Sequence, residues 1–468
     1  MSYEYLMIVH PIRRNTNKTP IPTCPYKFPD GQGDIAKFLE GERNSEGWAK
    51  EHGHIYRIWS GRTPEIVLTR PEDIKQVFRD SNTHLKASNN NAGWLMGEVL
   101  GSCLGLVSGE EWQDIRLATA ASFTHGEVVD RLEQVERLTM DHFAQLHCHG
   151  KLSDNVINPV QDLRMLPFWI VADHIYGPLD SHARLELEAL IPLRESLFAR
   201  VIQGGATRFA WSRILPTKTN SDLREFKQRW HEWNDAVAHK AQNSQPEAPI
   251  VTMFRAVRQG KISPESLYQT LDEMLFANLD VTMGAISWNL MFLAANPDTQ
   301  DQIRDEITAA RAAKDGKLWK EYLRSPSTLL AYSILESARL KPLAAFTVPQ
   351  AAPIAHEIAG YCIPPRTNYI IDTYAINQRN AFWGEDTETY RPQRFLHHSK
   401  SDIRYQYWRF GFGPRQCLGK HLAEMMIRCL LVHLLENYKL SMRKDSRWEK
   451  NPDTWIMHPM TELRCERL

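Results

Sequence analysis

The residues Phe410-Gly411-Phe412-Gly413-Pro414-Arg415-Gln416-Cys417-Leu418-Gly419 form a glycine-rich loop around a single cysteine. Directly after them, apolar residues recur at helical spacing from Leu422 to Leu434, the pattern of an amphipathic helix. Cys417 would therefore lie just before a helix N-terminus, where backbone N–H groups and the helix dipole favour a thiolate. The glycines let a flat ligand approach the backbone, and Arg415 adds a positive charge. Together these features predict one anionic sulfur presented to a large planar metal cofactor.

Other interpretations of this loop are less consistent with its residues. A lone cysteine is most often a small buried hydrophobic residue, and this applies to Cys417 taken alone. The phosphate-loop orders G-x-x-x-x-G-K-[ST] and G-x-G-x-x-G are absent, and no C-x-x-C pair suggests zinc. His421 is the nearest further metal ligand, and one histidine does not complete a zinc site. What remains is ligation by a single thiolate, for which haem iron is the known acceptor.

The spacing F-x-x-G-x-R-x-C-x-G resembles the haem-binding signature of the cytochrome P-450 superfamily at every signature position. The resemblance implies a mainly α fold with small β-sheets, in which haem b lies between a long central helix and the helix after the cysteine loop. It implies Cys417 as the axial iron ligand. The residues that it places around the cofactor are Phe410, Gly413, Arg415, Cys417 and Gly419. The implied activity is that of a haem-thiolate monooxygenase, which activates O2 to hydroxylate a small organic molecule.

Composition limits the possible partners and the compartment. The 468 residues include 56 Lys+Arg and 56 Asp+Glu, so the formal net charge is zero and no nucleic-acid or polyanion partner is expected. Seven scattered cysteines argue against a disulfide framework and for a reducing compartment. No run of about 18 apolar residues could span a membrane.

Residues 1–35 are expected to be a proline-rich linker, either an anchor remnant or an ordinary tail, before a single catalytic domain over 36–468. The segment from Arg13 to Pro29 resembles the hinge that follows the anchor helix of eukaryotic family members. The resemblance implies the cytosolic face of the endoplasmic reticulum membrane if the native chain has an anchor, or a peripheral membrane contact. Without an anchor we expect a soluble, cytoplasmic protein.

Periodicity and capping residues predict the main elements. In chain order these are a helix over 45–52, strands over 55–60 and 65–69, a helix from 71, a long loop over 82–108, a helix from 110, mostly helix over 125–250, one unbroken helix over 264–296, helix over 298–341 and a non-helical segment over 342–349.

The centre of the long helix reads Ala277-Asn278-Leu279-Asp280-Val281-Thr282. The family pattern here is Ala/Gly-Gly-x-Asp/Glu-Thr, an acid–alcohol pair that relays protons to oxygen. Asp280 matches, whereas Asn278 and Val281 depart from the pattern and the hydroxyl moves to Thr282, about 100° further round the helix. We expect Asp280 and Thr282 to be the catalytic pair. The alternative for Asp280 is an acid that pairs with a distant base.

Two further residue groups match family segments. Trp112 and Arg116 share a helix face at i,i+4 and, by resemblance, reach a haem propionate. Taken alone they would be a core tryptophan and a surface arginine. Glu336 and Arg339 form an E-x-x-R pair that, by resemblance, binds Arg394 and fixes the structure around the haem loop.

The segment from Pro342 to Pro349 is expected, by resemblance, to pass beside the haem and to line the substrate pocket. The residues expected in this pocket are Asn278, Val281, Ala345, Phe346, Thr347 and Trp455. Many relatives place an arginine near the end of this segment to bind a propionate, whereas this chain has Val348-Pro349-Gln350. The source of that charge is therefore open.

No flavin- or NAD-binding segment is present, so the electrons are expected from a separate NADPH-cytochrome P-450 reductase. The residues expected to form a basic docking face are Arg404, Arg409, Lys420 and Arg428. The variant helix centre resembles fungal secondary-metabolism members, among them those acting on diketopiperazines of the gliotoxin type. Two alternatives keep the haem: oxidative coupling, dehydration or peroxide-driven oxidation, because the hydroxyl is displaced, and a non-catalytic haem sensor or carrier.

Overall fold

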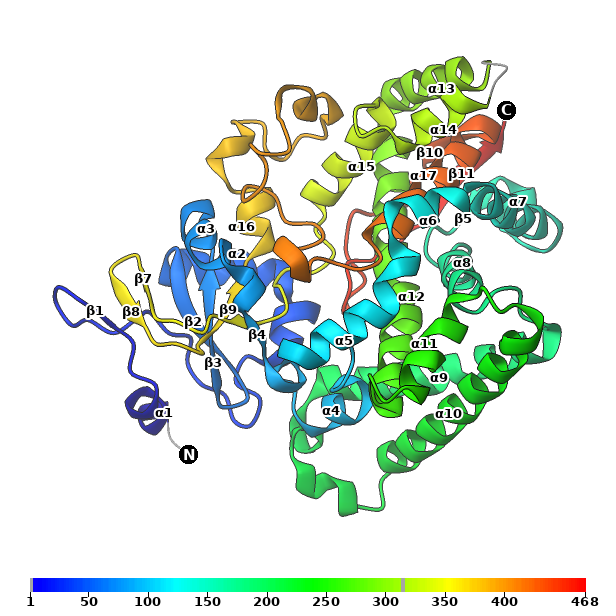
Figure 1. Cartoon of the computed structure of the whole chain (residues 1–468). Coiled ribbons are helices and arrows are strands. Elements are labelled where there is room, and N and C mark those ends of the chain that lie inside the picture. The colour runs from blue at the N-terminus through cyan, green and yellow to red at the C-terminus, as the bar shows by residue number, and fades with distance from the viewer. Residues whose placement is uncertain (1–2, 313–315) are drawn as a thin grey trace.

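A computed structural model describes residues 3–312 and 316–468. The described chain is mainly helical. Two of its small sheets lie together at one side, and the third lies near the C-terminus at the other side (Figure 1). This confirms the mainly α fold expected from the sequence. The helices of the first half are α1 (Tyr3–Val9), α2 (Gly41–His52), α3 (Pro71–Phe78), α4 (Trp94–Leu100), α5 (Gly109–Thr119), α6 (His125–Asp130), α7 (Leu132–His149), α8 (Met165–Tyr176), α9 (Ser181–Gln203) and α10 (Lys218–Ser244). Those of the second half are α11 (Pro249–Arg258), α12 (Pro264–Ala295), α13 (Pro297–Arg311), α14 (Lys317–Arg324), α15 (Leu329–Leu340), α16 (Thr373–Asn377) and α17 (Lys420–Asn437).

The strands form three small sheets with the orders β2-β3-β9-β6-β4, β1-β8-β7 and β10-β11-β5. Their bounds are β1 (Arg13–Arg14), β2 (Ile55–Ser60), β3 (Thr63–Leu68), β4 (Leu85–Lys86), β5 (Val156–Ile157), β6 (Gln350–Ala351), β7 (His356–Ile358), β8 (Tyr361–Ile363), β9 (Asn368–Ile371), β10 (Tyr438–Met442) and β11 (Leu463–Arg467). In the five-stranded sheet, β3 and β9 are parallel and the other pairs are antiparallel.

The N-terminal segment is packed, which differs from the expected linker. β1 pairs with β8, and Ile12 and Ile21 are fully buried against the sheets. The Arg57 side chain donates a hydrogen bond from Nη1 to the carbonyl of His10 at 2.6 Å. Proline content predicted a loose segment, but its isoleucines bury apolar surface on the sheet and thereby fix it. The division of the chain into segments 1–35 and 36–468 stays a prediction.

Two other expectations about secondary structure were wrong. The supposed loop over 82–108 contains β4 and α4, because three asparagines with positive φ at 89–91 turn the chain and Gly93 lets α4 begin. The supposed helix over 298–341 is three helices, and Pro326 prevents α14 from continuing into α15.

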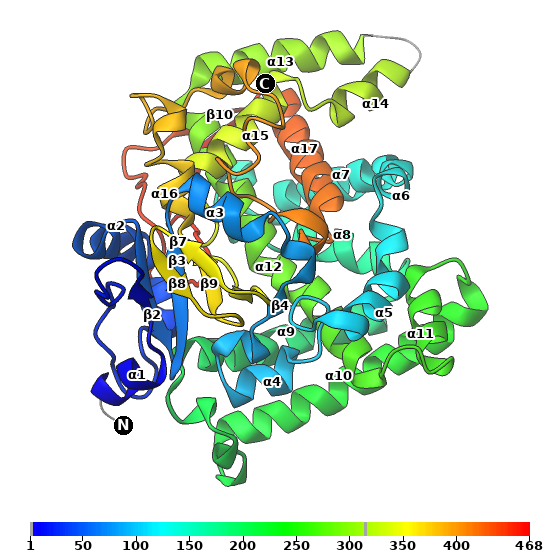
Figure 2. The same cartoon turned by 60° about the vertical axis from the view of Figure 1, so that its left-hand side comes forward.

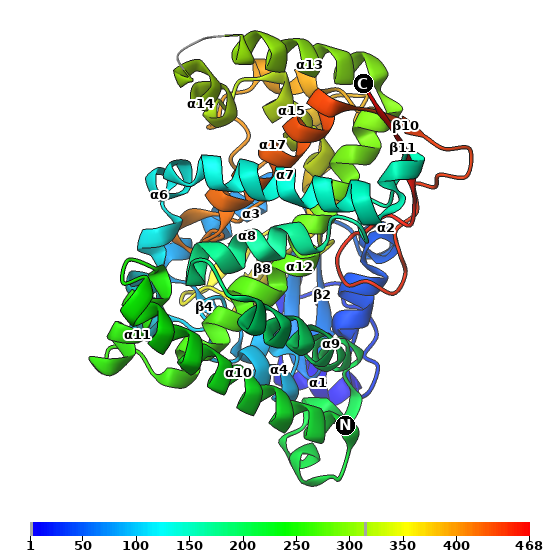
Figure 3. The ribbon, with the colours of Figure 1, turned by 90° about the vertical axis from the view of Figure 1, so that its right-hand side faces the viewer.

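The unbroken helix predicted over 264–296 is confirmed as α12. Its cap is Ser263, whose Oγ accepts a hydrogen bond from Ser266 N at 3.0 Å, and Pro264 occupies the first turn. At 1.5 Å per residue its 32 residues span about 48 Å, and it passes through the middle of the molecule (Figure 2). α12 packs against α8, α15 and α17, while α9 and α10 lie side by side at one end (Figure 3).

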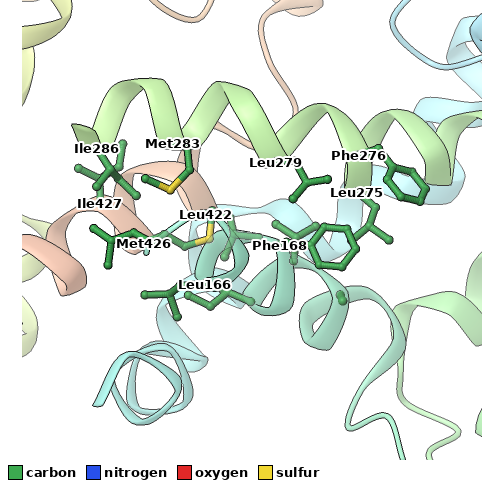
Figure 4. Close-up of a cluster of buried hydrophobic side chains, with 14 of the residues drawn as sticks. Leu166, Phe168, Leu275, Phe276, Leu279, Met283, Ile286, Leu422, Met426 and Ile427 are labelled. Carbon is green, nitrogen blue, oxygen red and sulfur yellow. The ribbon is translucent and has the colours of Figure 1, made fainter. Parts of the chain in front are cut away.

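A cluster of buried apolar side chains packs α12 against α8 and α17 (Figure 4). The labelled members are Leu166 and Phe168 of α8, Leu275, Phe276, Leu279, Met283 and Ile286 of α12, and Leu422, Met426 and Ile427 of α17. Burial of each such side chain contributes about 1.5–3 kcal/mol. This packing fixes the start of α17, and with it the cysteine loop, relative to the centre of α12.

A buried ion-pair cluster joins α15 to the segment before the cysteine loop. Glu336 accepts from Arg339 Nε at 2.8 Å, from Arg339 Nη2 at 2.9 Å and from Arg394 Nε at 3.2 Å. The backbone N–H of Arg391 adds a further bond of 3.0 Å to the same carboxylate. All three charged side chains are almost completely buried. Burial of these charges is tolerable because so many of their donors and acceptors are paired.

The cluster reaches the cysteine loop through Asn377. Arg339 Nη1 donates to the carbonyl of Asn377 at 3.0 Å. The Asn377 side chain then bonds both the carbonyl and the N–H of Trp408, at 2.9 and 2.7 Å. Trp408 lies two residues before Phe410, where the loop begins. The position of the loop backbone thus depends on the buried cluster around Glu336.

Removal of the carboxylate in Glu336→Ala should lower the free energy of unfolding by about 3–5 kcal/mol, because two buried guanidiniums would lose their counter-charge. Urea denaturation followed by circular dichroism measures this. Glu225→Gln is the matched control, since Glu225 pairs with Arg229 on an exposed face of α10 and should cost under about 1 kcal/mol. Equal effects of the two substitutions would contradict a stabilising role for the cluster.

Candidate active site

The cysteine loop is a tight turn that closes on itself before α17. The backbone N–H of Cys417 donates to the carbonyl of Phe410 at 2.8 Å, and α17 begins at Lys420. Gly413 has a φ of 66°, and a Cβ there would lie 2.7 Å from the Ser81 hydroxyl. The predicted order of loop, cysteine and helix is therefore present.

The surroundings of Cys417 act on its ionisation in opposite directions. Burial raises the pKa of the Cys417 thiol, although the N–H of Gly419 and the charges of Arg116 and Lys420 oppose this. The side chain is open to an internal cavity yet deep within the molecule, so it has little of the hydration that stabilises a thiolate. Coordination to a metal ion would favour the thiolate, because a coordinating thiol is deprotonated.

Cys417 opens into a cavity of about 990 Å3, at the upper end of the range for ligand sites. The cysteine loop and the start of α17 form one wall, and the centre of α12 forms another. Of the residues expected around the cofactor, the wall includes Trp112, Arg116, Phe410, Arg415, Cys417 and Gly419. Gly413 is not part of the wall, because its place in the turn directs it to Ser81.

Three basic side chains gather at one part of the cavity wall: Arg116 on α5, Arg415 on the cysteine loop and Lys86 on β4. The Arg415 guanidinium lies over the Trp112 ring at 4.7 Å and donates to the carbonyl of Val107 at 2.7 Å. Burial lowers the pKa of Arg415 to about 10 and also lowers the pKa of Arg116. The main cause of both shifts is the loss of hydration around the buried guanidiniums.

Lys86 was not found from the sequence. Burial, with the neighbouring Arg415 charge, lowers the pKa of Lys86 to about 7. Lys86 pairs directly with Gln350 across the β4–β6 ladder, so a cation lies beside the segment Val348-Pro349-Gln350, which has none of its own. No local signal marks Lys86, because the ladder joins segments more than 260 residues apart.

The acid of α12 is held by partners from two distant segments. Asp280 Oδ1 lies 3.3 Å from Arg164 Nη2, and Oδ2 accepts from the indole N–H of Trp455 at 3.2 Å. Arg164 also pairs with Glu195 of α9, and the His458 ring bonds the Asp280 carbonyl at 2.8 Å. Arg164 is thus a distant base of the kind that the alternative interpretation of Asp280 requires. Asp280 nevertheless lines the cavity.

Two neighbours of Asp280 on α12 also line the cavity. Val281 and Thr282 both line the cavity, and Thr282 is almost completely buried. The side chain of Asn278 lies outside the described part of the structure. Thr282 therefore lines the cavity in spite of its displaced register.

The N-terminal half of α12 is joined to the loop at 101–108. Gln269, Thr270 and Glu273 accept hydrogen bonds from the backbone N–H groups of Ser102, Leu104 and Gly105, at 2.7, 3.1 and 2.9 Å. A Cβ at Gly105 would overlap the Glu273 carboxylate, so this position requires glycine. Only Glu273 of the three acceptors also lines the large cavity. It lies two helical turns before Asp280, a spacing that could have identified it from the sequence.

The remaining pocket residues divide into two groups. Three of the residues expected in the pocket line the cavity: Phe346, Thr347 and Trp455. The Trp455 and Phe198 ring centroids lie 5.1 Å apart. Ala345 does not line it. Its side chain faces α2, where a Cβ on Gly41 would lie 2.6 Å from the Ala345 Cβ. In an extended segment neighbouring side chains point to opposite faces, which is why Ala345 and Phe346 separate.

The expected basic docking face is smaller than the sequence suggested. Arg428 is buried in α17 and donates to the carbonyls of Leu323 and Ser325 at 2.8 and 2.7 Å. Arg409 is mostly buried and pairs with Glu424 at 2.7 Å. Of the four residues, Arg404 and Lys420 have no ion-pair partner among residues 3–312 and 316–468.

The donor set of the cavity fits a haem group. A cysteine sulfur faces the cavity, and a cluster of three cations with an indole lies on its wall, which suits a metal with one thiolate ligand and two propionates. Comparison with known proteins agrees. The cytochrome P450 family model matches residues 40–465. The chain therefore belongs to the cytochrome P450 family, whose members in general hold haem by a cysteine thiolate.

The relatives share nearly the whole chain. The cytochrome P450 monooxygenase aclC of Aspergillus oryzae is 52% identical over 467 residues, which cover 99% of this chain and 95% of the relative. The monooxygenase asaD of Aspergillus flavus is 44% identical, with coverages of 99% and 90%. The monooxygenase gliC of Aspergillus fumigatus is 38% identical, with coverages of 98% and 92%. These matches confirm the family and enzyme class expected from the sequence. Within the described residues, none of the helices is long and apolar enough to cross a membrane.

Binding of metal-free protoporphyrin IX to the haem-free protein should weaken roughly tenfold as the pH rises from about 6 to 9. Lys86 loses its proton near pH 7 in the free protein, whereas a bound carboxylate would raise its pKa, so the complex holds more protons and high pH disfavours it. Fluorescence quenching gives the affinity. In Lys86→Met this pH dependence should disappear, and the porphyrin dimethyl ester, which lacks carboxylates, is the control ligand. The same pH dependence in wild type and Lys86→Met would rule out a propionate contact.

Proposed function

We propose that this protein is a haem b monooxygenase that activates O2 and hydroxylates a small organic molecule of fungal secondary metabolism. The observation that carries the proposal is that Cys417 and the centre of α12 line the same cavity. Bound haem would supply the oxidising chemistry, with the thiolate increasing the electron density on iron. The similarity to named Aspergillus monooxygenases supports the reaction class and the fungal setting.

The chain's own residues would hold and orient the cofactor. Cys417 would ligate the iron, and Gly419 would direct its N–H toward the sulfur. Trp112, Arg116 and Arg415, together with Lys86, would bind the propionates by charge and hydrogen bonds. The Glu336 cluster would act indirectly, since it positions the loop through Asn377 and Trp408.

Reduction in the presence of carbon monoxide should give the strongly red-shifted absorption band of a thiolate-ligated haem, and Cys417→Ser should lose it. Cys362→Ser is the matched control, because Cys362 is an exposed cysteine on β8. A difference spectrum of the purified proteins tests both. Retention of the band in Cys417→Ser, or its absence from the wild type, would overturn the proposed ligand.

A second candidate function follows from the α12 site: oxidative coupling, dehydration or peroxide-driven oxidation. Val281 brings no hydroxyl to its position, and both carboxylate oxygens of Asp280 already have partners in Arg164 and Trp455. A carboxylate held in this way must exchange a partner before it can pass a proton inward. In the primary proposal, Asp280 and Thr282 deliver protons or position the water that does so.

Turnover with NADPH and a flavoprotein reductase distinguishes the two. Asp280→Asn should lower this turnover by about 10²-fold if Asp280 supplies protons, because general acid catalysis contributes at least this much. Turnover with hydrogen peroxide should fall far less, since peroxide already carries the protons that O2 must acquire. Thr282→Val tests the hydroxyl in the same assay. An equal fall with both oxidants would show that Asp280 only joins α12 to Arg164 and Trp455.

An NADPH-cytochrome P-450 reductase is the proposed electron donor, and the cytosolic face of the endoplasmic reticulum is the proposed location. A peripheral membrane contact is supported by exposed apolar side chains, Phe28, Trp211 and Ile214, on two segments that Asp30 joins by accepting from Gly205 N at 2.8 Å. Co-sedimentation with phospholipid vesicles would measure this contact, and the absence of any binding would contradict it.

A further inference from the structure

Arg194 of α9 is a buried cation that the proposed mechanism does not use. It is 4% exposed, and its Nε donates to both oxygens of Asp272 on α12, at 2.7 and 2.9 Å. The guanidinium lies over the Phe198 ring at 4.9 Å. Asp272 is completely buried. The Arg194 guanidinium is therefore held on one side by the ion pair with Asp272 and on another by the Phe198 ring.

Among the described residues, the hydrogen bonds of this guanidinium come from Nε alone. Among the described residues, the acceptor placed against Arg194 is the Asp272 carboxylate, and Nε makes both bonds. The two terminal nitrogens carry four further N–H groups. Arg194 lines the large cavity, whereas Asp272 does not, so the unused edge is the part available to a ligand. A buried donor without an acceptor is unfavourable, and a ligand that supplies one gains that free energy.

The charge around this edge favours a neutral ligand. Burial raises the pKa of Asp272 to about 6, so its carboxylate is mostly ionised at neutral pH and balances the Arg194 charge. Glu273 lines the same cavity, and the charges of Lys86 and Arg415 oppose the burial that raises its pKa. A carboxylate ligand would bring Arg194 a negative charge that Asp272 already supplies. A carbonyl oxygen accepts two N–H bonds without adding charge.

We propose that the free edge of Arg194 binds a carbonyl oxygen of a neutral substrate, so that the enzyme selects carbonyl-bearing molecules over hydrocarbons of the same shape. Asp272 is the positioning residue that holds this edge toward the cavity. The inference rests on the proposed haem function, since it concerns the substrate of the same cavity. This role gives a chemical reason for the presence of Arg194 on the same cavity-lining part of α9 as the apolar residues Phe198 and Val201.

The experiment uses the haem-loaded protein and imidazoles with short, medium and long alkyl tails. Each is compared with its partner that carries a ketone in the tail. The imidazole binds the iron in every case, so a spectral titration reports the effect of the tail alone. At one tail length at least, the ketone should bind roughly tenfold more tightly than its hydrocarbon partner, as a hydrogen bond to a charged group predicts.

In Arg194→Lys the ketone preference should fall to within about twofold, while affinity for the hydrocarbon tail should stay unchanged. The lysine ammonium can still pair with Asp272 but lacks the planar outer edge. Arg200→Lys is the matched control, because Arg200 lies on the same helix, is exposed and does not line the cavity. It should keep the full preference.

If Arg194→Lys does not fold, Arg194→Leu combined with Asp272→Leu removes both buried charges, a replacement that often preserves folding. The same loss of ketone preference is expected. No preference at any tail length in the wild type, or a preference that survives these substitutions, would overturn the inference. A wild type that shows no imidazole spectrum would instead contradict the haem function itself, so the two failures are distinguishable.

Discussion

The structure depends on one buried carboxylate, Glu336, which two buried guanidiniums share. Without Arg339 and Arg394 its charge could not be kept in the interior, and without Glu336 theirs could not. The cluster extends by hydrogen bonds to Asn377 and Trp408 and so to the backbone of the cysteine loop. The apolar packing of α17 on α12 fixes the other end of this loop. A sulfur is thereby held in a rigid setting, as the axial ligand of a cofactor requires.

Charged side chains of both signs line the cavity. Cations gather where Lys86, Arg116 and Arg415 meet, and burial lowers the pKa of each. The acids of α12 have different partners: Asp272 pairs with Arg194, and Asp280 with Arg164. Glu273 accepts a backbone N–H bond and lies near Lys86 and Arg415. The cation cluster suits a cofactor that carries carboxylates, and the neutral pair of Arg194 with Asp272 suits a neutral substrate.

Sequence reasoning succeeded where the signal is local. The extent of α12 followed from its caps and from the absence of interior breakers, and the loop before α17 followed from glycine spacing. It failed where several short elements replace a simple pattern, as at 82–108, and where burial decides, as for Arg428. Gly413 and Ala345 belong to segments that line the cavity, but at both positions the Cα–Cβ direction points away from it, toward Ser81 and Gly41 respectively.

The sequence by itself determined the family, the mainly α fold, the cysteine that faces the cofactor site and the residues of the Glu336 cluster, because each depends on motifs within a few residues or on helical periodicity. Only the tertiary structure decided that Lys86 lies beside the β6 segment, that Arg164 and Trp455 bond Asp280, and that Arg194 lines the cavity while its Nε bonds Asp272. These contacts join residues at least 78 positions apart. Such pairs are set by packing and by the balance of buried charge over the whole molecule, which no local pattern contains.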